Sequence, residues 1–431
     1  WEIQGWMILI LGWVFVPFYS RSMVYTMPEF LERRYNPQSR TILSVISLVS
    51  YVLTKVAVTV YAGGLVFQQV FGIKELWGID FFWIAAIGLV VLTALYTIFG
   101  GMKSVLYTSV LQTPILLLGS LIILVLGFKE LGGWDEMMRV CGAVTVNDYG
   151  DTMTNLIRSN DDANFPWLGA LIGSAIIGFW YWCTDQFIVQ RVLSGKNEKE
   201  ARRGTIFGAY LKLLPVFLFL IPGMIAFALH QKYIGAGGEG FLPMLANGTA
   251  NADAAFPTLV AKLLPAGVKG LVVCGILAAL MSSLASLFNS SAMLFTIDFY
   301  KRFRPETPEK KLVGIGQIAT VVIVILGILW IPIMRSVGDV LYTYLQDVQS
   351  VLAPGIAAAF LLGICWKRTS AQGGMWGLIA GMIIGLTRLG AKVYYSNAGE
   401  VADSTFKYLF YDMNWLFFCG WMFLFCIIVV I

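Results

Sequence analysis

Eleven apolar segments that are candidates to cross a lipid bilayer dominate this sequence. A spanning helix needs about 20 mostly apolar residues, and a helix satisfies its own backbone hydrogen bonds in lipid. The pattern therefore predicts an all-α polytopic membrane protein, with residues 1–431 forming a single integral membrane domain. The expected spans lie near residues 5–19, 41–72, 79–98, 105–127, 167–190, 205–229, 268–297, 312–334, 339–365, 374–391 and 408–431.

The composition excludes a soluble globular protein. Only 13% of the residues are Asp, Glu, Lys or Arg and 58% are apolar, whereas soluble domains carry about 25% charged residues. The formal net charge is +5, and the basic residues are spread through short loops between the apolar spans. We therefore expect a lipid bilayer and no nucleic acid as partner. The single histidine, His230, excludes a multi-histidine metal site.

The basic residues predict the orientation, because cytoplasmic loops carry an excess of Lys and Arg. Alternate loops hold 17 of the 30 basic residues, although several of the loops between them are longer. Five of the six cysteines lie in or beside apolar segments, which leaves Cys141 alone in a long loop and no loop disulfide framework. We expect a multi-pass cell-membrane protein, with a bacterial inner membrane slightly favoured. The loops expected in the cytoplasm are 20–40, 99–104, 191–204, 298–311 and 366–373.

Polar side chains inside spans are costly in lipid, so each is a candidate functional residue. In the fifth span Gly178, Tyr181, Trp182 and Asp185 fall on one face of a helix. Aromatic rings beside hydrogen-bonding groups suit a sugar, but an aromatic belt with Asp185 at the cytoplasmic edge explains the same spacing. In the sixth span, the Lys212 ammonium could bind a polyol hydroxyl or a carboxylate, or its stem could reach the interface.

The seventh span carries a stripe of small polar residues, with Ala279, Ser282, Ser283, Ser286 and Asn289 on one helical face. Sodium prefers oxygen ligands, so serine hydroxyls and a main-chain carbonyl could form part of a site. Small residues also allow close helix packing, and that alternative stays open.

The ninth span combines Gln346 and Asp347 with Pro354, and a kinked or locally unwound helix is expected there. A helix that is merely bent by proline is the alternative. Lys55, in the second span, is expected to reach water because that span is long. Polar groups on at least four spans together favour a water-accessible path for a solute.

Several motifs closely resemble the sodium/glucose cotransporters of the solute:sodium symporter family. They follow the family's order over most of the chain, and two of them, WYWCTDQ and MSSLASLFNS, are specific. The motifs are YTMPEFLERRY (25–35), LYTIFGGMKSVLYTSVLQT (95–113), WYWCTDQFIVQRVLSGKN (180–197), AYLKLLP (209–215), LPAGVKGL (264–271), LMSSLASLFNSSAMLFTIDFYKR (280–302) and FLLGICWKR (360–368).

The resemblance implies a LeuT-like core of two inverted five-helix repeats with extra peripheral helices. By alignment the first span corresponds to the second core helix, so the first core helix is expected to be missing from this chain. The family's sodium ligands correspond to the carbonyl of Ala279 and the hydroxyls of Ser282 and Ser283.

Sugar contacts of the family correspond to Lys212 and Gln346, and its sugar-stacking gate ring corresponds to Tyr181, with Trp182 beside it. Gly178 replaces an Asn or Thr that contacts the sugar. Glu2 resembles a sugar-binding glutamate but is one position out of register.

Ser109 replaces an aspartate that the family links to sodium exit or to a second sodium site, so a second coupled sodium is less expected. The resemblance predicts a sodium-driven hexose symporter, for glucose or galactose, without enzymatic activity. A myo-inositol or polyol carrier and a sodium-gated sugar sensor are the alternatives.

Overall fold

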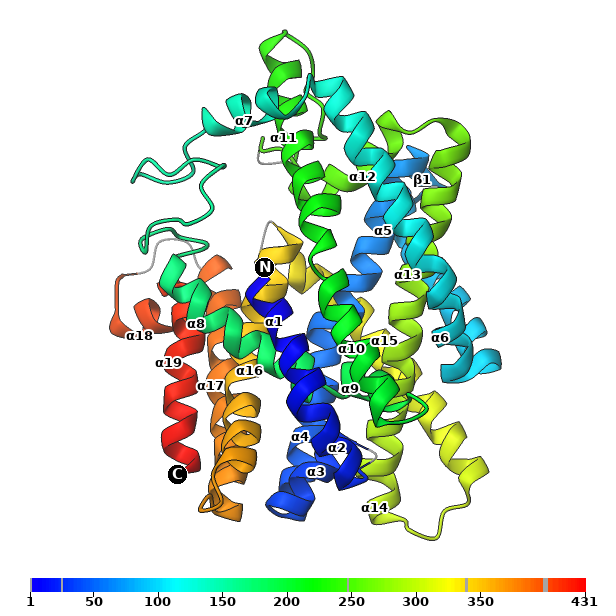
Figure 1. Ribbon diagram of the computed structural model, residues 1–431, viewed down its shortest axis with the longest axis vertical. Coiled ribbons are helices and arrows are strands. Elements are labelled where there is room, and N and C mark those ends of the chain that lie inside the picture. The colour runs from blue at the N-terminus through cyan, green and yellow to red at the C-terminus, as the bar shows by residue number, and fades with distance from the viewer. Residues whose placement is uncertain (1, 25, 246–247, 338–339, 398–401) are drawn as a thin grey trace. The chain divides into compact units, whose positions relative to one another are not determined.

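The computed structural model describes residues 2–24, 26–245, 248–337, 340–397 and 402–431, and most of them are helical (Figure 1). Among these residues, nine helices are long and apolar enough to cross a membrane. The other two expected spans correspond to a shorter apolar helix, Phe81–Leu95, and to a helix pair, Thr405–Asp412 and Trp415–Val430, that bends by 108°. The prediction of an all-α polytopic membrane protein is confirmed.

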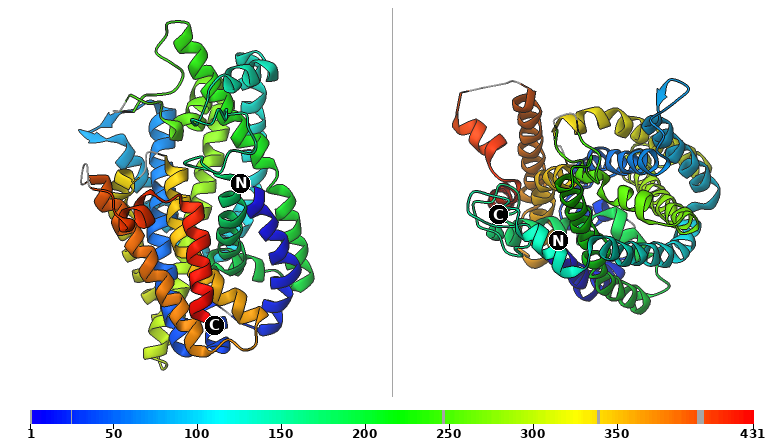
Figure 2. Two further views of the ribbon diagram at one scale, coloured as in Figure 1. Left: turned by 90° about the vertical axis from the view of Figure 1, so that its left-hand side faces the viewer. Right: turned by 90° about the horizontal axis from the view of Figure 1, so that it is seen from above.

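The chain divides into two compact units, of which unit 1 comprises residues 1–57, 160–212 and 287–431. In Figures 1 and 2 the helices α16, α17 and α19 of this unit run side by side. The helices of unit 1 are α1 (Glu2–Ile10), α2 (Val16–Ser22), α3 (Met27–Arg34), α4 (Pro37–Ser50), α8 (Trp167–Gly178), α9 (Gln186–Leu193), α10 (Glu198–Leu211), α14 (Lys301–Phe303), α15 (Glu309–Val337), α16 (Leu341–Cys365), α17 (Ala371–Asn397), α18 (Thr405–Lys407) and α19 (Trp415–Val430).

Short π-helical segments extend or join several of these helices. A π-helical turn has i→i+5 hydrogen bonds and often marks a functional position inside a span. In unit 1 these segments are η1 (Leu11–Phe15), η2 (Tyr51–Val56), η3 (Phe179–Thr184), η6 (Leu294–Tyr300) and η7 (Tyr408–Asp412).

Unit 2 comprises residues 58–159 and 213–286. Its elements are α5 (Ala57–Phe71), β1 (Glu75–Leu76), β2 (Ile79–Asp80), α6 (Phe81–Leu131), α7 (Trp134–Gly142), η4 (Val216–Leu220), α11 (Ile221–Gly235), the 3₁₀ turn η5 (Ala252–Ala254), α12 (Ala255–Leu263) and most of α13 (Ala266–Met293).

The two strands of unit 2 form an antiparallel hairpin in which Leu76 pairs with Ile79. Its two-residue turn, Trp77 and Gly78, has positive φ angles of 55° and 75°, the geometry that hairpin turns favour.

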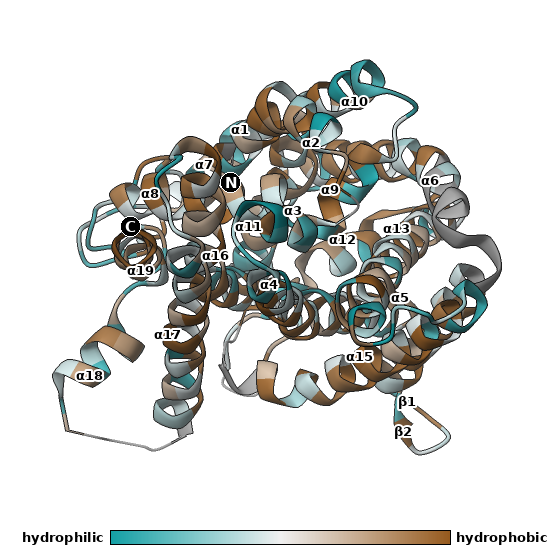
Figure 3. Cartoon of the chain, turned by 90° about the horizontal axis from the view of Figure 1, so that it is seen from below, coloured by the Kyte–Doolittle hydropathy of each residue, from teal (hydrophilic) through white to brown (hydrophobic). Residues whose placement is uncertain are grey.

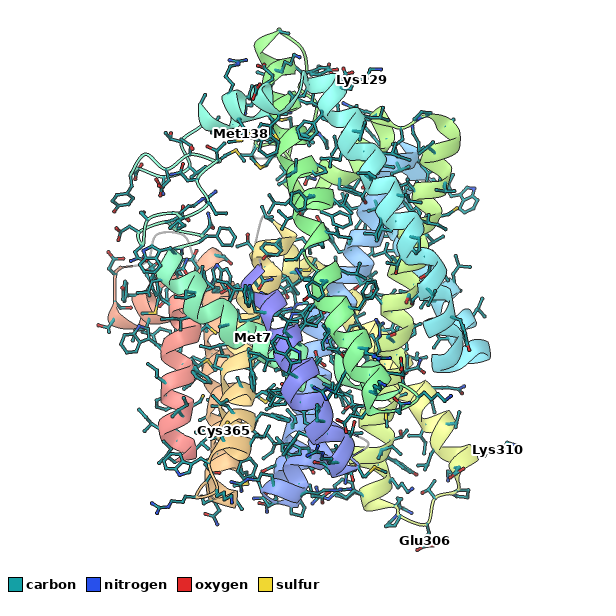
Figure 4. All side chains as sticks on the ribbon, in the orientation of Figure 1. Met7, Lys129, Met138, Glu306, Lys310 and Cys365 are labelled. Atoms are coloured by element: carbon teal, nitrogen blue, oxygen red, sulfur yellow. The ribbon has the colours of Figure 1, made fainter. Side chains whose placement is uncertain are left out.

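Helix starts follow local capping chemistry. Thr26, Asn36 and Asn197 cap α3, α4 and α10 by accepting a hydrogen bond from a backbone N–H three residues on, as short polar side chains do at helix starts. The hydrophilic start of α10 and the apolar character of α19 are visible in Figure 3. Figure 4 labels Cys365, the last residue of α16.

Small residues allow close helix contacts inside each unit. In unit 2 a Cβ on Gly119 of α6 would lie 2.4 Å from Val272 of α13. In unit 1, Gly355 of α16 faces Gly381 of α17, with 3.1 Å between its added Cβ and the Gly381 Cα. Such contacts require glycine, because any larger side chain would force the helices apart.

The structure differs from three sequence predictions at this level. Backbone hydrogen bonding in α6 continues through 99–104, where we expected a loop, and α7 includes Cys141, which is buried. α16 is a continuous helix across Pro354, so the expected local unwinding is wrong. A proline removes one backbone hydrogen bond, and neighbouring helices can hold the remaining turns in place.

Candidate functional site

Asp185 is the centre of a buried polar cluster in unit 1. The residue has an extended backbone between η3 and α9, and its carboxylate caps α9 by accepting the Phe187 N–H at 3.0 Å. The same carboxylate accepts the Tyr51 hydroxyl at 2.9 Å and pairs with the Lys55 ammonium. The Asp185 and Lys55 side chains are only 3% and 9% exposed, so each charge depends on the other for compensation.

Three aromatic rings surround the ammonium of this pair. The Lys55 Nζ lies 4.2 Å from the ring centroid of Phe187, 4.7 Å from that of Tyr51 and 5.1 Å from that of Tyr181. These distances lie within the range of cation–π attraction. The Tyr181 ring also meets Trp182 edge to face, with 5.0 Å between centroids. Tyr181 is therefore fixed both by a charge and by a neighbouring ring.

Two sequence predictions about this cluster are wrong. Gly178 and Asp185 do not share one face of a regular helix, because η3 is π-helical and the helix ends before Asp185. Lys55 does not reach water, and its partner is 130 positions away in the sequence. The Lys55 position was visible as a charge in an apolar span, but nothing in the sequence indicated its partner.

An amide pair joins α1 to α16 near Gly178. The Gln4 Nε2 donates to the Gln346 Oε1 at 3.3 Å, and Gln346 is 4% exposed. Gly178 of α8 packs against α1, since a Cβ there would lie 3.1 Å from both the Gln4 Cα and the Met7 Cγ. Unit 1 thus brings Gly178 and Gln346 to the same residue of α1.

The indole of Trp182 adds a hydrogen-bond donor to this part of unit 1. Its Nε1 is buried and has no hydrogen-bond partner among the residues that the structure describes. A buried indole N–H normally finds an acceptor. With amide groups on α1 and α16 and the ring face of Tyr181, the arrangement offers donors, acceptors and an apolar stacking surface. These are the groups that a polyhydroxylated, uncharged ligand requires.

The serine stripe lies on the continuous helix α13, as predicted. Ser282 is 6% exposed, and its hydroxyl lies 2.6 Å from the Ser109 hydroxyl of α6, within unit 2. Ala279 and Ser283 are half-buried. Two hydroxyls in contact provide oxygen ligands of the kind that a hard monovalent cation accepts. No group of three or more His, Cys, Asp or Glu side chains among the described residues could hold a metal ion.

Lys212 and Glu2 lie at the ends of helices. Lys212 is half-buried at the C-terminus of α10, where its backbone N–H donates to the Gly208 carbonyl at 3.0 Å. Glu2 begins α1, and its side chain lies outside the part of the chain that is described.

Unit 1 holds two further buried charge clusters, and the sequence analysis identified neither Asp298 nor the partners of Asp347. Asp298 of η6 is fully buried and accepts hydrogen bonds from Thr26 at 2.9 Å and from the Arg40 Nε at 2.7 Å. Asp347, the neighbour of Gln346, pairs with Arg388 and Lys392 of α17. A carboxylate inside an apolar run was a usable signal in both cases, but the partners lie on other segments, which the pattern does not identify.

Comparison with known proteins connects these sites to a family. The model of the Sodium:solute symporter family matches residues 3–381. The chain belongs to this family. Its relatives are transporters and not enzymes, in line with the expectation from the sequence.

Several curated relatives share more than a third of their aligned residues with this chain. A human sodium/myo-inositol cotransporter 2 is 37% identical over 401 residues, covering 90% of the chain and 58% of the relative. A sodium/mannose cotransporter of Bos taurus is 39% identical over 89% of the chain and 65% of the relative. A sodium/glucose cotransporter 1 of Ovis aries is 37% identical over 99% of the chain and 66% of the relative. The chain therefore spans between 58% and 66% of the length of these relatives.

A solved structure confirms the fold. A Na⁺-coupled sialic acid symporter, in a substrate-bound outward-open state, aligns with a TM-score of 0.72 and 21% identity. The alignment covers the whole of this chain and 82% of the symporter. The expected LeuT-like architecture is thus the fold of this chain.

Proposed function

We propose that the protein is a sodium-coupled symporter of a hexose, with sodium entry driving sugar uptake by alternating access. The observation that carries this proposal is the grouping in unit 1 of Tyr181, Trp182, Gly178 and Gln346, in a chain of the sodium:solute symporter family. The relatives named for glucose and mannose transport support a hexose.

In this proposal, the Tyr181 ring stacks on the sugar, and Trp182, Gln346 and Lys212 bind its hydroxyls. Glu2 remains a proposed sugar contact. Because Gly178 has no side chain, it supplies no hydrogen bond and only permits α1 to approach.

Sodium binds the carbonyl of Ala279 and the hydroxyls of Ser282 and Ser283. Sodium stabilises an outward-open state, and the sugar then closes the gates. The membrane potential adds about 2.3 kcal/mol per charge for each 100 mV. We place the protein in a bacterial inner membrane, because its loops contain no disulfide framework and the six cysteines are free thiols.

A myo-inositol or other polyol carrier is the second candidate. The myo-inositol cotransporter among the relatives favours it, as does the absence of a side chain at Gly178. A sodium-gated sugar sensor is the alternative outside transport, because it would use the same binding groups without coupled uptake.

Uptake into proteoliposomes that contain the full-length protein separates these functions. Labelled glucose, galactose and myo-inositol are offered with an inward sodium gradient, or with choline in its place. Accumulation of a hexose above equilibrium only with sodium supports the proposal, and preferential accumulation of inositol supports the polyol carrier. Sugar binding with an ion current but without accumulation identifies a sensor.

A further inference from the structure

A cluster of three charges, two of them buried and one half-buried, links α16 to α17 in unit 1. The Asp347 Oδ2 lies 2.5 Å from the Lys392 Nζ, and its Oδ1 lies 3.6 Å from Arg388. The Arg388 side chain is fully buried, and that of Asp347 is 8% exposed. Arg388 and Lys392 are four positions apart on one helix, so both cations reach the same carboxylate from one face of α17.

Arg388 also contacts the segment around the start of α19. Its guanidinium donates to the carbonyls of Leu409 at 3.3 Å and Met413 at 2.7 Å and lies 4.1 Å from the centroid of the Phe418 ring. Leu409 and Met413 flank the end of η7, where the chain bends by 108° before α19. Carbonyls at a helix end lack helical partners. The guanidinium of Arg388 supplies hydrogen bonds to these carbonyls, and the same bonds hold Arg388 in place.

Stability alone gives a weak reason for this cluster. Replacing a buried ion pair by apolar side chains is often neutral or stabilising, because desolvation of the charges offsets their attraction. Moreover, the Asp347 Oδ1 and the Arg388 Nε have no hydrogen-bond partner among the described residues. Two polar atoms of the cluster therefore lack hydrogen bonds, and a functional role accounts for the cluster better than a contribution to stability does.

The packing of α16 against α17 shows what the cluster can add. The helices meet through glycines, since an added Cβ at Gly381 would lie 2.8 Å from the Gly355 Cα and one at Gly385 would lie 2.3 Å from the Val351 carbonyl oxygen. Glycines allow close approach, but they have no side chain that could fix the rotation of a helix about its axis. An ion pair between the two helices fixes that rotation.

We propose that Asp347, held by Arg388 and Lys392, is a positioning residue for Gln346. The two residues are consecutive on α16, so their side chains point about 100° apart around one axis. When Asp347 is directed to α17, Gln346 is directed to α1, where its amide accepts the Gln4 hydrogen bond. The proposal rests on the proposed role of Gln346 in sugar binding.

The test is a double-mutant cycle on sodium-driven uptake by the full-length protein in proteoliposomes. Asp347→Asn removes the charge at constant volume and should raise the sugar KM about tenfold, with half-saturating sodium and maximal rate within twofold of wild type. Gln346→Ala should also raise the sugar KM while sodium binding stays measurable. In the Gln346→Ala background, adding Asp347→Asn should change the KM less than twofold, because no amide remains to be positioned.

The matched control is Asp298→Asn, which removes another buried carboxylate paired with an arginine in unit 1. It should lower the yield of folded protein but leave the sugar KM unchanged. If Asp347→Asn does not fold, Lys392→Gln, which removes one of the two cations, should raise the KM in the same direction by a smaller factor.

An unchanged KM in the Asp347 or Lys392 variant overturns the inference, and so does a full additive effect in the Gln346→Ala background. An unchanged KM in Gln346→Ala overturns both the assigned sugar contact and the inference. Absence of sodium-driven uptake by the wild type refutes the proposed function itself, which distinguishes the two failures.

Discussion

The proposed sodium site depends on single hydroxyl groups, and Ser282 is the most informative of them. Ser282→Ala should raise the half-saturating sodium concentration about tenfold, because losing one oxygen ligand at a cost of about 1.4 kcal/mol weakens binding by that factor. The sugar KM at saturating sodium should stay within about twofold. Sodium-dependent uptake kinetics measure both values.

Ser291 provides the control on the same helix. It is fully buried, and its hydroxyl has no hydrogen-bond partner among the described residues. Ser291→Ala should leave the sodium dependence unchanged. If Ser282→Ala behaves like Ser291→Ala, the sodium assignment is wrong.

Gly178 offers a second test at the residue scale. Gly178→Ala places a methyl group 3.1 Å from the Gln4 backbone, and overpacking of this kind costs about 1–3 kcal/mol. We expect a lower melting temperature in detergent. Gly204→Ala on α10 is the matched control, since a Cβ there meets nothing within 4 Å, and it should be neutral or stabilising. Equal stability of the two variants would contradict the packing argument.

At the scale of helices and turns, the Lys55–Asp185 pair joins η2 to the start of α9. Lys55→Met leaves a buried carboxylate without its cation, which typically costs about 3–5 kcal/mol. The double variant Lys55→Met/Asp185→Asn should recover most of that loss. Thermal unfolding of the single and double variants measures the difference.

A solvent-exposed pair provides the comparison for this prediction. Arg203 and Glu200 are 65% and 53% exposed, and exposed ion pairs contribute at most about 1 kcal/mol. Arg203→Met should therefore change the melting temperature little. If Lys55→Met is as stable as Arg203→Met, the buried Lys55–Asp185 pair does not stabilise the fold more than an exposed pair does.

The helices were largely predictable, and their internal breaks were not. Apolar length alone located the segments around α1, α13 and α16, because lipid requires helices of about 20 residues. The π-helical turn at Tyr181 and Trp182 could not be predicted, since it depends on packing and not on local composition. The same holds for the Asp185 partner, because a contact across 130 positions leaves no trace in a helical pattern.

At the scale of the whole molecule, the basic residues predict which loops face the cytoplasm. In right-side-out membranes, a membrane-impermeant maleimide should label a cysteine introduced at Asp161 and not one introduced at Glu306. Both residues are exposed in loops, and Figure 4 labels Glu306 in the turn between α14 and α15. The exposed thiols Cys274 and Cys365 are replaced by serine beforehand. If only the Glu306→Cys variant were labelled, the protein would have the orientation opposite to the predicted one.

The position of the Asp347 cluster has a consequence for biogenesis. α16 and α17 are consecutive and are separated by residues 366–370 only, so their charges can neutralise one another as soon as the hairpin leaves the ribosome and enters the translocon. A carboxylate entering lipid alone would oppose insertion. Lys55 has no such neighbour and must await Asp185, which is synthesised much later. The α16–α17 hairpin can therefore insert as a unit, whereas the span that holds Lys55 depends on assembly after a further 130 residues have been made.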